Sequence, residues 1–195
     1  MTEGWPVPLG GVTETVVTTR EPDGAWSVAA LGVHAGDPAT ARTYGRTRTR
    51  LNVERTGRGV VQFVRDPLVF VAAALERVSA DAPVLAAADA WVEVDFDRAG
   101  GEASGGGAVA GGDAPTAWSL VAGRAGVARR VVPTTNRGRA AVVEATVAAS
   151  RLGVSGYDDA ELGDRIAYFD AVVRRCGDDR AVAAMDRVQA LVDGG

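Results

Sequence analysis

The feature that most constrains the fold of this chain is a change of hydrophobic pattern near Pro133. Before it, apolar segments are short, rich in β-branched residues and separated by Gly, Pro and Asp, which is typical of strands and turns. After it, three longer segments begin with helix-capping residues and end near glycine. Strands followed by helices predict an α+β protein in which a β-barrel or sheet precedes a helical C-terminal unit. We therefore divide the chain into domains 1–132 and 133–195.

The first part alternates strands with loops. Turn residues between 19 and 25 predict that its first two strands form a hairpin. Loops are predicted at 37–45 and in the glycine-rich segment 99–115, which we expect to be mobile because it has almost nothing to bury. Strands are predicted at 12–19, 25–33, 59–66 and 90–97, with one strand or two in 116–132.

Two short helices interrupt these strands, and three longer ones follow. The first is predicted at 49–56, with Gly57 as its C′ residue. The second begins at Asp66-Pro67, since aspartate is a good N-cap and proline suits the first helical position. It is apolar nearly all round, so we expect it to plug one end of the barrel or sheet. The C-terminal helices are predicted within 134–153, 158–177 and 179–194.

Composition excludes several classes of function. The single Cys176 cannot form an internal disulfide, and with the single His34 it cannot form a Cys/His zinc cluster. A net charge of −4 disfavours general binding to nucleic acid. No apolar segment is long enough to cross a membrane, and we recognise no signal peptide, so we expect a cytoplasmic protein. Because one cysteine and one histidine cannot form a zinc cluster, we expect no metal site. Chemistry is expected from a bound cofactor rather than from side chains.

All 21 basic residues are arginine, and four of them lie within residues 45–57. A polyanion, a small phosphorylated ligand or plain solvent could each account for this cluster. The acidic remainder of the chain disfavours the polyanion. Guanidinium groups, threonine hydroxyls and free N–H groups at a helix start are the donors that suit a compact phosphate. On the residues alone, a phosphate site and a solvated loop both remain open.

Three blocks of the chain resemble a known family in order and spacing. They are "ETVVTTREPDGAWSVAALGV" (14–33), "RTRTRLNVERTGRGVVQFVRDPLVFVAAAL" (46–75) and "NRGRAAVVEATVAASRLG" (136–153). Together they resemble the archaeal domain-of-unknown-function family 447, which belongs to the FMN-binding split-barrel superfamily with flavin reductases and pyridoxamine-phosphate oxidase. The resemblance implies a six-stranded split β-barrel that forms a homodimer, with FMN in a groove between the subunits.

The resemblance also implies where the cofactor lies. The flavin phosphate is expected near the arginine cluster, at positions Arg46, Thr47, Arg48, Thr49 and Asn52. The flavin ring is expected along the second hairpin strand, at Ser27, Val28 and Ala29, although this chain departs from the family pattern at Ser27 and Ala30.

A charged stripe on the first C-terminal helix allows two interpretations. Asn136 and Arg137 could reach the flavin or substrate groove from the helix start. Alternatively, Arg137, Glu144 and Arg151, which are seven residues apart, form a stripe of intrahelical or interdomain ion pairs.

The resulting hypothesis is an FMN-binding flavoprotein that is an oxidoreductase using flavin N5 for hydride or electron transfer. The sequence identifies no catalytic side chain and no substrate. The alternative is a non-catalytic split-barrel module that binds another phosphorylated or pterin-like ligand. A nucleic-acid binder is disfavoured by the net charge and by the lack of aromatic residues between the arginines.

Overall fold

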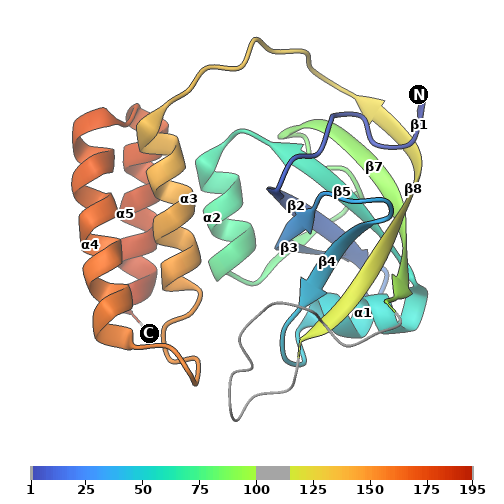
Figure 1. Cartoon of the computed structure of the whole chain (residues 1–195), viewed down its shortest axis with the longest axis horizontal. Helices are drawn as coiled ribbons and strands as arrows, with labels where there is room; N and C mark the ends of the chain where they lie inside the picture. The colour runs from blue at the N-terminus through green and yellow to red at the C-terminus, as the bar shows by residue number, and fades with distance from the viewer. Residues whose placement is uncertain (1, 100–114, 195) are drawn as a thin grey trace. The chain divides into compact units, whose positions relative to one another are not determined.

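The computed structural model of this protein describes residues 2–99 and 115–194 and divides into two compact units (Figure 1). One unit comprises Met1–Arg65 and Val78–Arg130, and the other comprises Asp66–Arg77 and Val131–Gly195. Most of the loop that we predicted to be mobile, residues 100–114, lies outside the described residues.

The first unit is an antiparallel barrel. Its strands pair in the order β8-β4-β3-β2-β5-β7, and β7 pairs again with β8, which closes a ring of six strands. Two short strands add to this ring, β1 alongside β8 and β6 alongside β3. The strands are β1 (Thr2–Glu3), β2 (Val12–Arg20), β3 (Trp26–His34), β4 (Ala39–Thr43), β5 (Arg58–Val64), β6 (Val78–Ala80), β7 (Ala88–Arg98) and β8 (Thr116–Val127).

Alternating side chains fill the barrel. On β7, Val92, Val94 and Phe96 are buried inside, while the residues between them face outward. Trp118 of β8 is also buried and donates its indole N–H to the hydroxyl of Thr43 at 2.9 Å. Helix α1 (Arg48–Thr56) lies across one end of the barrel and adds Val53 to the core. The strands predicted from alternation are therefore confirmed.

The barrel contains strands that we did not predict. Segment 37–45 was expected to be a loop, but it contains β4, whose residues Ala39, Ala41 and Thr43 are buried. Because its buried side chains are small, this segment shows no clear alternation of apolar and polar residues. The strand is stabilised by β3 and β8, which are distant in sequence. For the same reason the short strands β1 and β6 were missed. Residues 116–127 form a single strand rather than two.

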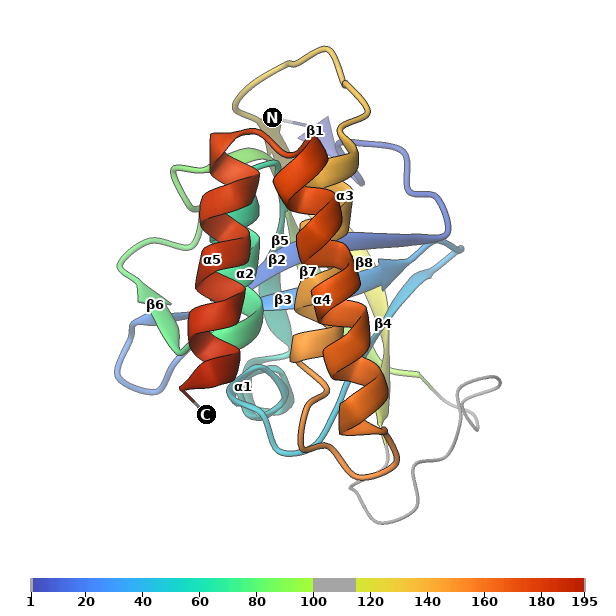
Figure 2. The same ribbon diagram turned by 90° about the vertical axis from the view of Figure 1, so that its left-hand side faces the viewer.

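The second unit is a bundle of helices, which run side by side in Figure 2. Each begins at an N-cap whose side chain accepts a backbone hydrogen bond, at Asp66, Asn136, Asp158 and Asp178. The predicted start of the second helix at Asp66-Pro67 is confirmed, as is Gly57 after α1, with a φ of 65°. The helices are α2 (Pro67–Leu75), α3 (Arg137–Ala149), α4 (Asp159–Cys176) and α5 (Asp179–Asp193).

Helix α2 belongs to the helical core, although it comes from the first part of the sequence. Val71 is fully buried in a cluster that includes Val142 of α3 and Met185 of α5. Glu76, directly after α2, accepts two hydrogen bonds from Arg187 of α5, at 2.9 and 2.7 Å. The boundary that we expected at residue 132 therefore assigns residues 66–77 to the wrong unit. An all-round apolar helix needs neighbours on several sides, and the bundle supplies them.

Two arginines form ion pairs with one aspartate where β7 and β8 meet. Asp89 accepts a hydrogen bond from Arg129 Nε at 2.9 Å and forms an ion pair with Arg65. Its backbone carbonyl accepts the N–H groups of Ala128 and Arg129. The pKa of Asp89 lies below its ordinary value, mainly because Arg65 donates a hydrogen bond to its carboxylate. Burial of the carboxylate has the opposite, smaller effect on this pKa.

This cluster predicts how the barrel responds to acid. Because the pKa of Asp89 is lowered by folding, its stabilisation is present above the unfolded pKa, near pH 4, and is lost as the pH falls through the folded value. We expect Asp89→Asn to destabilise the barrel at pH 7 and to reduce the loss of stability below about pH 4. Denaturant titrations followed by tryptophan fluorescence test this, with Asp97→Asn on the same strand as an exposed control. Parallel pH profiles for the wild type and Asp89→Asn would contradict it.

Candidate functional site

The arginine cluster forms the turn into α1 and the body of that helix. Gly45, with a φ of 57°, turns the chain after β4. The hydroxyl of Thr47 caps the helix by accepting the N–H of Arg50 at 3.3 Å. In the described part of the chain, the N–H groups of Arg48 and Thr49 at this helix start have no partner. A helix start with free N–H groups favours an anion.

The arginines of the cluster differ in what they contact. Arg46 is exposed and has no hydrogen bond or ion pair among the described residues. Arg48 donates to the carbonyl of Val78 at 2.9 Å and lies 3.3 Å from the Glu21 carboxylate. The other two arginines contact groups of the barrel unit. Arg50 donates to the Glu54 carboxylate and to the Gly45 carbonyl. Arg55 donates to the carbonyl of Arg20. Arg46 is therefore the arginine of this cluster most available to a ligand.

The two remaining polar residues predicted for the phosphate are buried. Asn52 is 3% exposed and donates from Nδ2 to the hydroxyl of Thr19 at 3.1 Å. Thr49 is 7% exposed, and its hydroxyl has no partner within residues 2–99 and 115–194. Asn52 thus ties α1 to β2, and its predicted contact with the phosphate stays a prediction. Thr49 remains a candidate donor.

Strand β3 carries the residues predicted for the flavin ring. It pairs with β2 along its whole length, and its other edge pairs with β6 at Trp26–Val28 and with β4 at Val33–His34. Ser27 and Val28 therefore have partner strands on both edges, and the Ser27 side chain is 2% exposed. The edge opposite β2 has no partner strand at residues 29–32 in the described structure.

Backbone direction shows which groups this open edge presents. The Leu31 carbonyl accepts a hydrogen bond from the side-chain hydroxyl of Thr15 on β2 at 2.6 Å, and the Ala35 N–H donates to the carbonyl of Gly11, just before β2. Neighbouring residues of a strand point their backbone groups to opposite edges. Ala30 and Gly32 therefore direct N–H and C=O groups toward the open edge. Of the predicted ring residues, Ala29 lies at this opening, whereas Ser27 and Val28 lie within the paired region.

The structure brings the helix start and β3 together through residues that we did not predict. Thr19, which binds Asn52, lies opposite Ser27 in the β2–β3 pair. Val78, which accepts from Arg48, lies opposite Val28 in the β3–β6 pair. No motif marks Thr19, Glu21 or Val78, because their roles depend on strand register.

Asn136 and Arg137 lie in the helical unit. Asn136 caps α3 by accepting the N–H of Arg139 at 3.0 Å, and Arg137 is exposed. The charged stripe is not a chain of mutual ion pairs: Glu144 faces Arg165 of α4 at 3.9 Å, and Arg151 stacks over Tyr157. The proposed contact of Asn136 and Arg137 with a flavin groove stays a prediction.

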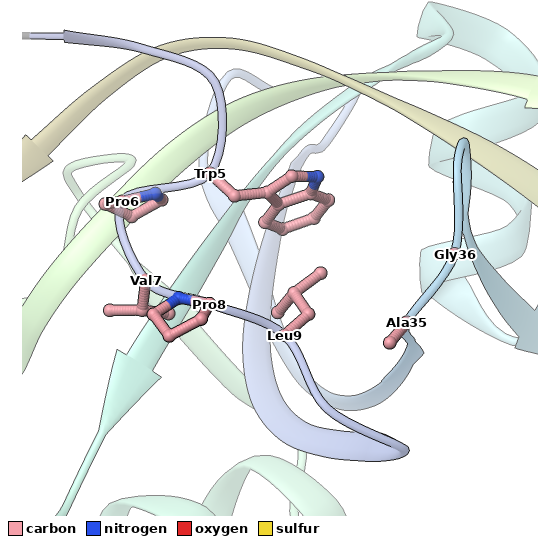
Figure 3. A pocket seen from close by; sticks show the side chains of 7 residues that line it. All are labelled: Trp5, Pro6, Val7, Pro8, Leu9, Ala35 and Gly36. Atoms are coloured by element: carbon pink, nitrogen blue, oxygen red, sulfur yellow. The ribbon is translucent and has the colours of Figure 1, made fainter.

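A separate pocket of about 440 Å³ lies between the N-terminal segment and the turn after β3 (Figure 3). Trp5 and Leu9 extend from this segment toward Ala35 and also pack against the barrel core. None of the lining residues carries a charge, so the pocket supplies no acid or base. The residues that line it are Trp5, Pro6, Val7, Pro8, Leu9, Ala35 and Gly36.

Residues 2–99 and 115–194 contain no group of three or more His, Cys, Asp or Glu side chains that could hold a metal ion. Within the same residues, no helix is long and apolar enough to span a membrane.

Comparison with solved structures identifies the fold. An FMN-bound DUF447 protein from Methanosarcina mazei is 23% identical, with a TM-score of 0.80, over 94% of this chain and 96% of that one. The flavin reductase of styrene monooxygenase from Pseudomonas putida is 13% identical, with a TM-score of 0.46, over 63% of this chain and 93% of that one. Component B of nitrilotriacetate monooxygenase from Bacillus cereus is 14% identical, with a TM-score of 0.41, over 65% and 74%. The predicted split barrel followed by a helical unit is confirmed by the first of these.

Two family models together match most of the sequence. A search of curated proteins found no match. The model of the N-terminal domain of the protein of unknown function DUF447 matches residues 13–107, and a second DUF447 model matches residues 136–190. The chain therefore belongs to the DUF447 family.

Proposed function

We propose that this protein is a flavoprotein that binds FMN noncovalently. The observation that carries the proposal is the FMN-bound DUF447 protein from Methanosarcina mazei, which has the same fold over 94% of this chain. The barrel unit adds physical support, because the start of α1 and the open edge of β3 both belong to it. FMN has a phosphate at one end and a ring with hydrogen-bonding atoms at the other, so these two features fit its two ends.

The phosphate end fits the start of α1. Arg46 supplies a guanidinium that has no partner among the described residues, and the backbone N–H groups of Arg48 and Thr49 supply donors next to it. The hydroxyls of Thr47 and Thr49 lie on the same turn. Such charge-assisted hydrogen bonds to a phosphate are stronger than neutral ones. Arg48 contributes positive charge from its position beside Glu21.

The ring end fits the open edge of β3. Ala30 and Gly32 offer alternating N–H donors and C=O acceptors, which can pair with the edge of a flavin ring, and Ala29 lies at the beginning of this edge. Small side chains at these three positions let a planar group approach the backbone closely. We place the ring contacts here rather than at Ser27 and Val28.

We further propose that the protein is a cytoplasmic homodimer with the flavin between its two copies, and that it is an oxidoreductase. The superfamily resemblance supports the dimer. The chemistry that bound FMN supplies is hydride or electron transfer at N5, while the protein holds and orients it. The alternative, a binding module for another phosphorylated or pterin-like ligand, predicts that such a ligand co-purifies in place of FMN.

The first experiment is to identify the bound ligand. We expect purified protein to show the visible absorbance of a flavin, or to acquire it when FMN is added, and mass spectrometry of the released ligand should show FMN. Light scattering of the loaded protein should give the mass of two chains. Colourless protein that does not bind added FMN would contradict the proposal, and a monomer with bound FMN would contradict the dimer alone. Reduction of bound FMN by NADH or NADPH, followed by absorbance, separates an oxidoreductase from a binding module.

The phosphate site predicts a specific effect of Arg46→Ala. This change should weaken FMN binding roughly 10- to 100-fold, because a hydrogen bond to a charged group contributes about 1.5–3 kcal/mol. Affinity for riboflavin, which lacks the phosphate, should stay unchanged. Fluorescence titration with both flavins measures the two affinities. The control is Arg58→Ala, which removes an exposed arginine just beyond the other end of α1. Equal losses for FMN and riboflavin would show that Arg46 does not bind the phosphate.

A further inference from the structure

We propose that Asn52 and Thr19 form a positioning pair that sets the phosphate-binding end of the FMN site relative to its ring-binding edge. This inference rests on the proposed FMN binding. The Asn52 Nδ2 group donates to the Thr19 hydroxyl at 3.1 Å, across 33 residues of sequence. Asn52 is 3% exposed and Thr19 is 1% exposed, so the hydrogen bond between them is buried inside the barrel unit.

The pair joins the two elements that the cofactor must bridge. Asn52 lies one helical turn after Arg48, close to the free N–H groups at the start of α1. Thr19 lies opposite Ser27, two residues before the open edge of β3 begins at Ala29. A shift of α1 along the barrel would therefore change the separation between the phosphate donors and the ring-binding edge.

A second contact constrains the same separation from the other edge of β3. The Arg48 guanidinium donates to the Val78 carbonyl at 2.9 Å, and Val78 pairs with Val28. The helix is thus tied to β2 by Asn52 and to β6 by Arg48, with β3 between these two strands. Binding groups must be held within about 0.5 Å of their productive positions to keep full affinity. Directional hydrogen bonds from buried groups provide such control, whereas apolar packing alone permits sliding.

The quantity that reports positioning is the preference for FMN over riboflavin, measured as the ratio of their dissociation constants. Asn52→Ala and Thr19→Val each remove the hydrogen bond from one side. Each should reduce the FMN preference about 3- to 10-fold, the range expected for one hydrogen bond. The double variant should lose no more than either single variant, because both remove the same interaction. Thr19→Ser keeps the hydroxyl and should retain the preference.

The controls separate positioning from general destabilisation. Thr146→Val removes an equally buried threonine hydroxyl in the helical unit, which donates to the Val142 carbonyl at 2.7 Å, and should leave the FMN preference unchanged. Denaturant titration of each variant confirms that it is folded under the binding conditions. If Thr19→Val does not fold, Thr19→Ala breaks the same bond and takes its place.

Different outcomes test the inference and the proposed function. If the wild-type protein binds no FMN, the proposed function fails. If the wild type binds FMN but Thr19→Val keeps the full preference over riboflavin, the positioning role is overturned. It is also overturned if the losses of the two single variants multiply in the double variant, since the two residues would then act independently.

Discussion

Gly138→Ala is expected to lower the free energy of unfolding of the helical unit by about 3 kcal/mol or more, because it overpacks a close backbone contact. A Cβ atom at Gly138 would lie 2.3 Å from the Cα of Gly177 and 3.0 Å from the carbonyl carbon of Cys176. These are backbone atoms at the end of α4, so no flexible side chain can move aside. Helix α3 would have to separate from the turn between α4 and α5, which the Arg139–Asp178 pair also joins.

Circular dichroism during denaturation measures this effect on the helices. All four tryptophans lie in the barrel unit, so their fluorescence follows that unit separately. The matched control is Gly163→Ala on α4, where a Cβ would meet nothing within 4 Å. That change should be neutral or stabilise the helix by roughly 0.5–1 kcal/mol. A Gly138→Ala protein as stable as the wild type would show that α3 does not pack this closely on the turn.

Gln62→Leu is expected to destabilise the barrel unit by about 3 kcal/mol, since it removes the three hydrogen bonds that this buried side chain makes to Thr18, Pro83 and Leu85. Gln62 is fully buried on β5 and binds the segment that follows β6. Its amide donates to the Pro83 carbonyl at 3.0 Å, and its carbonyl accepts the Leu85 N–H at 2.7 Å. Leucine has a similar size but can replace none of these bonds. Strand β6, which contains Val78 and leads into this segment, would loosen, and with it the contact to Arg48.

Tryptophan fluorescence during denaturation measures the stability of the barrel in this variant. Gln189→Leu, at a partly exposed position on α5, is the control and should change stability by no more than about 0.5 kcal/mol. We also expect Gln62→Leu to weaken FMN binding, because it releases one of the two contacts that hold α1. Unchanged barrel stability would show that Gln62 does not anchor the segment.

Elements with strong local signals were predicted well. The caps at Asp66 and Gly57 and the alternation of Val92, Val94 and Phe96 depend on neighbours in sequence, and the structure confirms them. Strand β4 and the membership of α2 in the helical core depend on partners far away in the chain, and they were missed. Local pattern describes an element, whereas its neighbours are chosen by packing over the whole fold.

For the candidate site too, some features were predicted from the sequence and others depended on tertiary contacts. The arginine cluster and the family resemblance predicted a site near α1 and β3, and among the described residues Arg46 is exposed and has no partner. Asn52 and Arg48, in contrast, have side chains that suit a phosphate, but they make contacts within the protein. Asn52 contacts Thr19, and Arg48 contacts Glu21 and Val78. Their side chains could bind either a ligand or the protein, and only their surroundings decide between these partners.

By itself, then, the sequence determined the DUF447 family, the succession of strands and helices, and the segment that carries the positive charge. The tertiary structure alone decided that α2 joins the C-terminal helices, that residues 29–32 of β3 have an open edge, and which polar residues near α1 are buried. The physical reason is that caps, periodicity and charge are properties of short segments. Strand register, burial and hydrogen-bond partners arise only when distant segments compete for the same contacts.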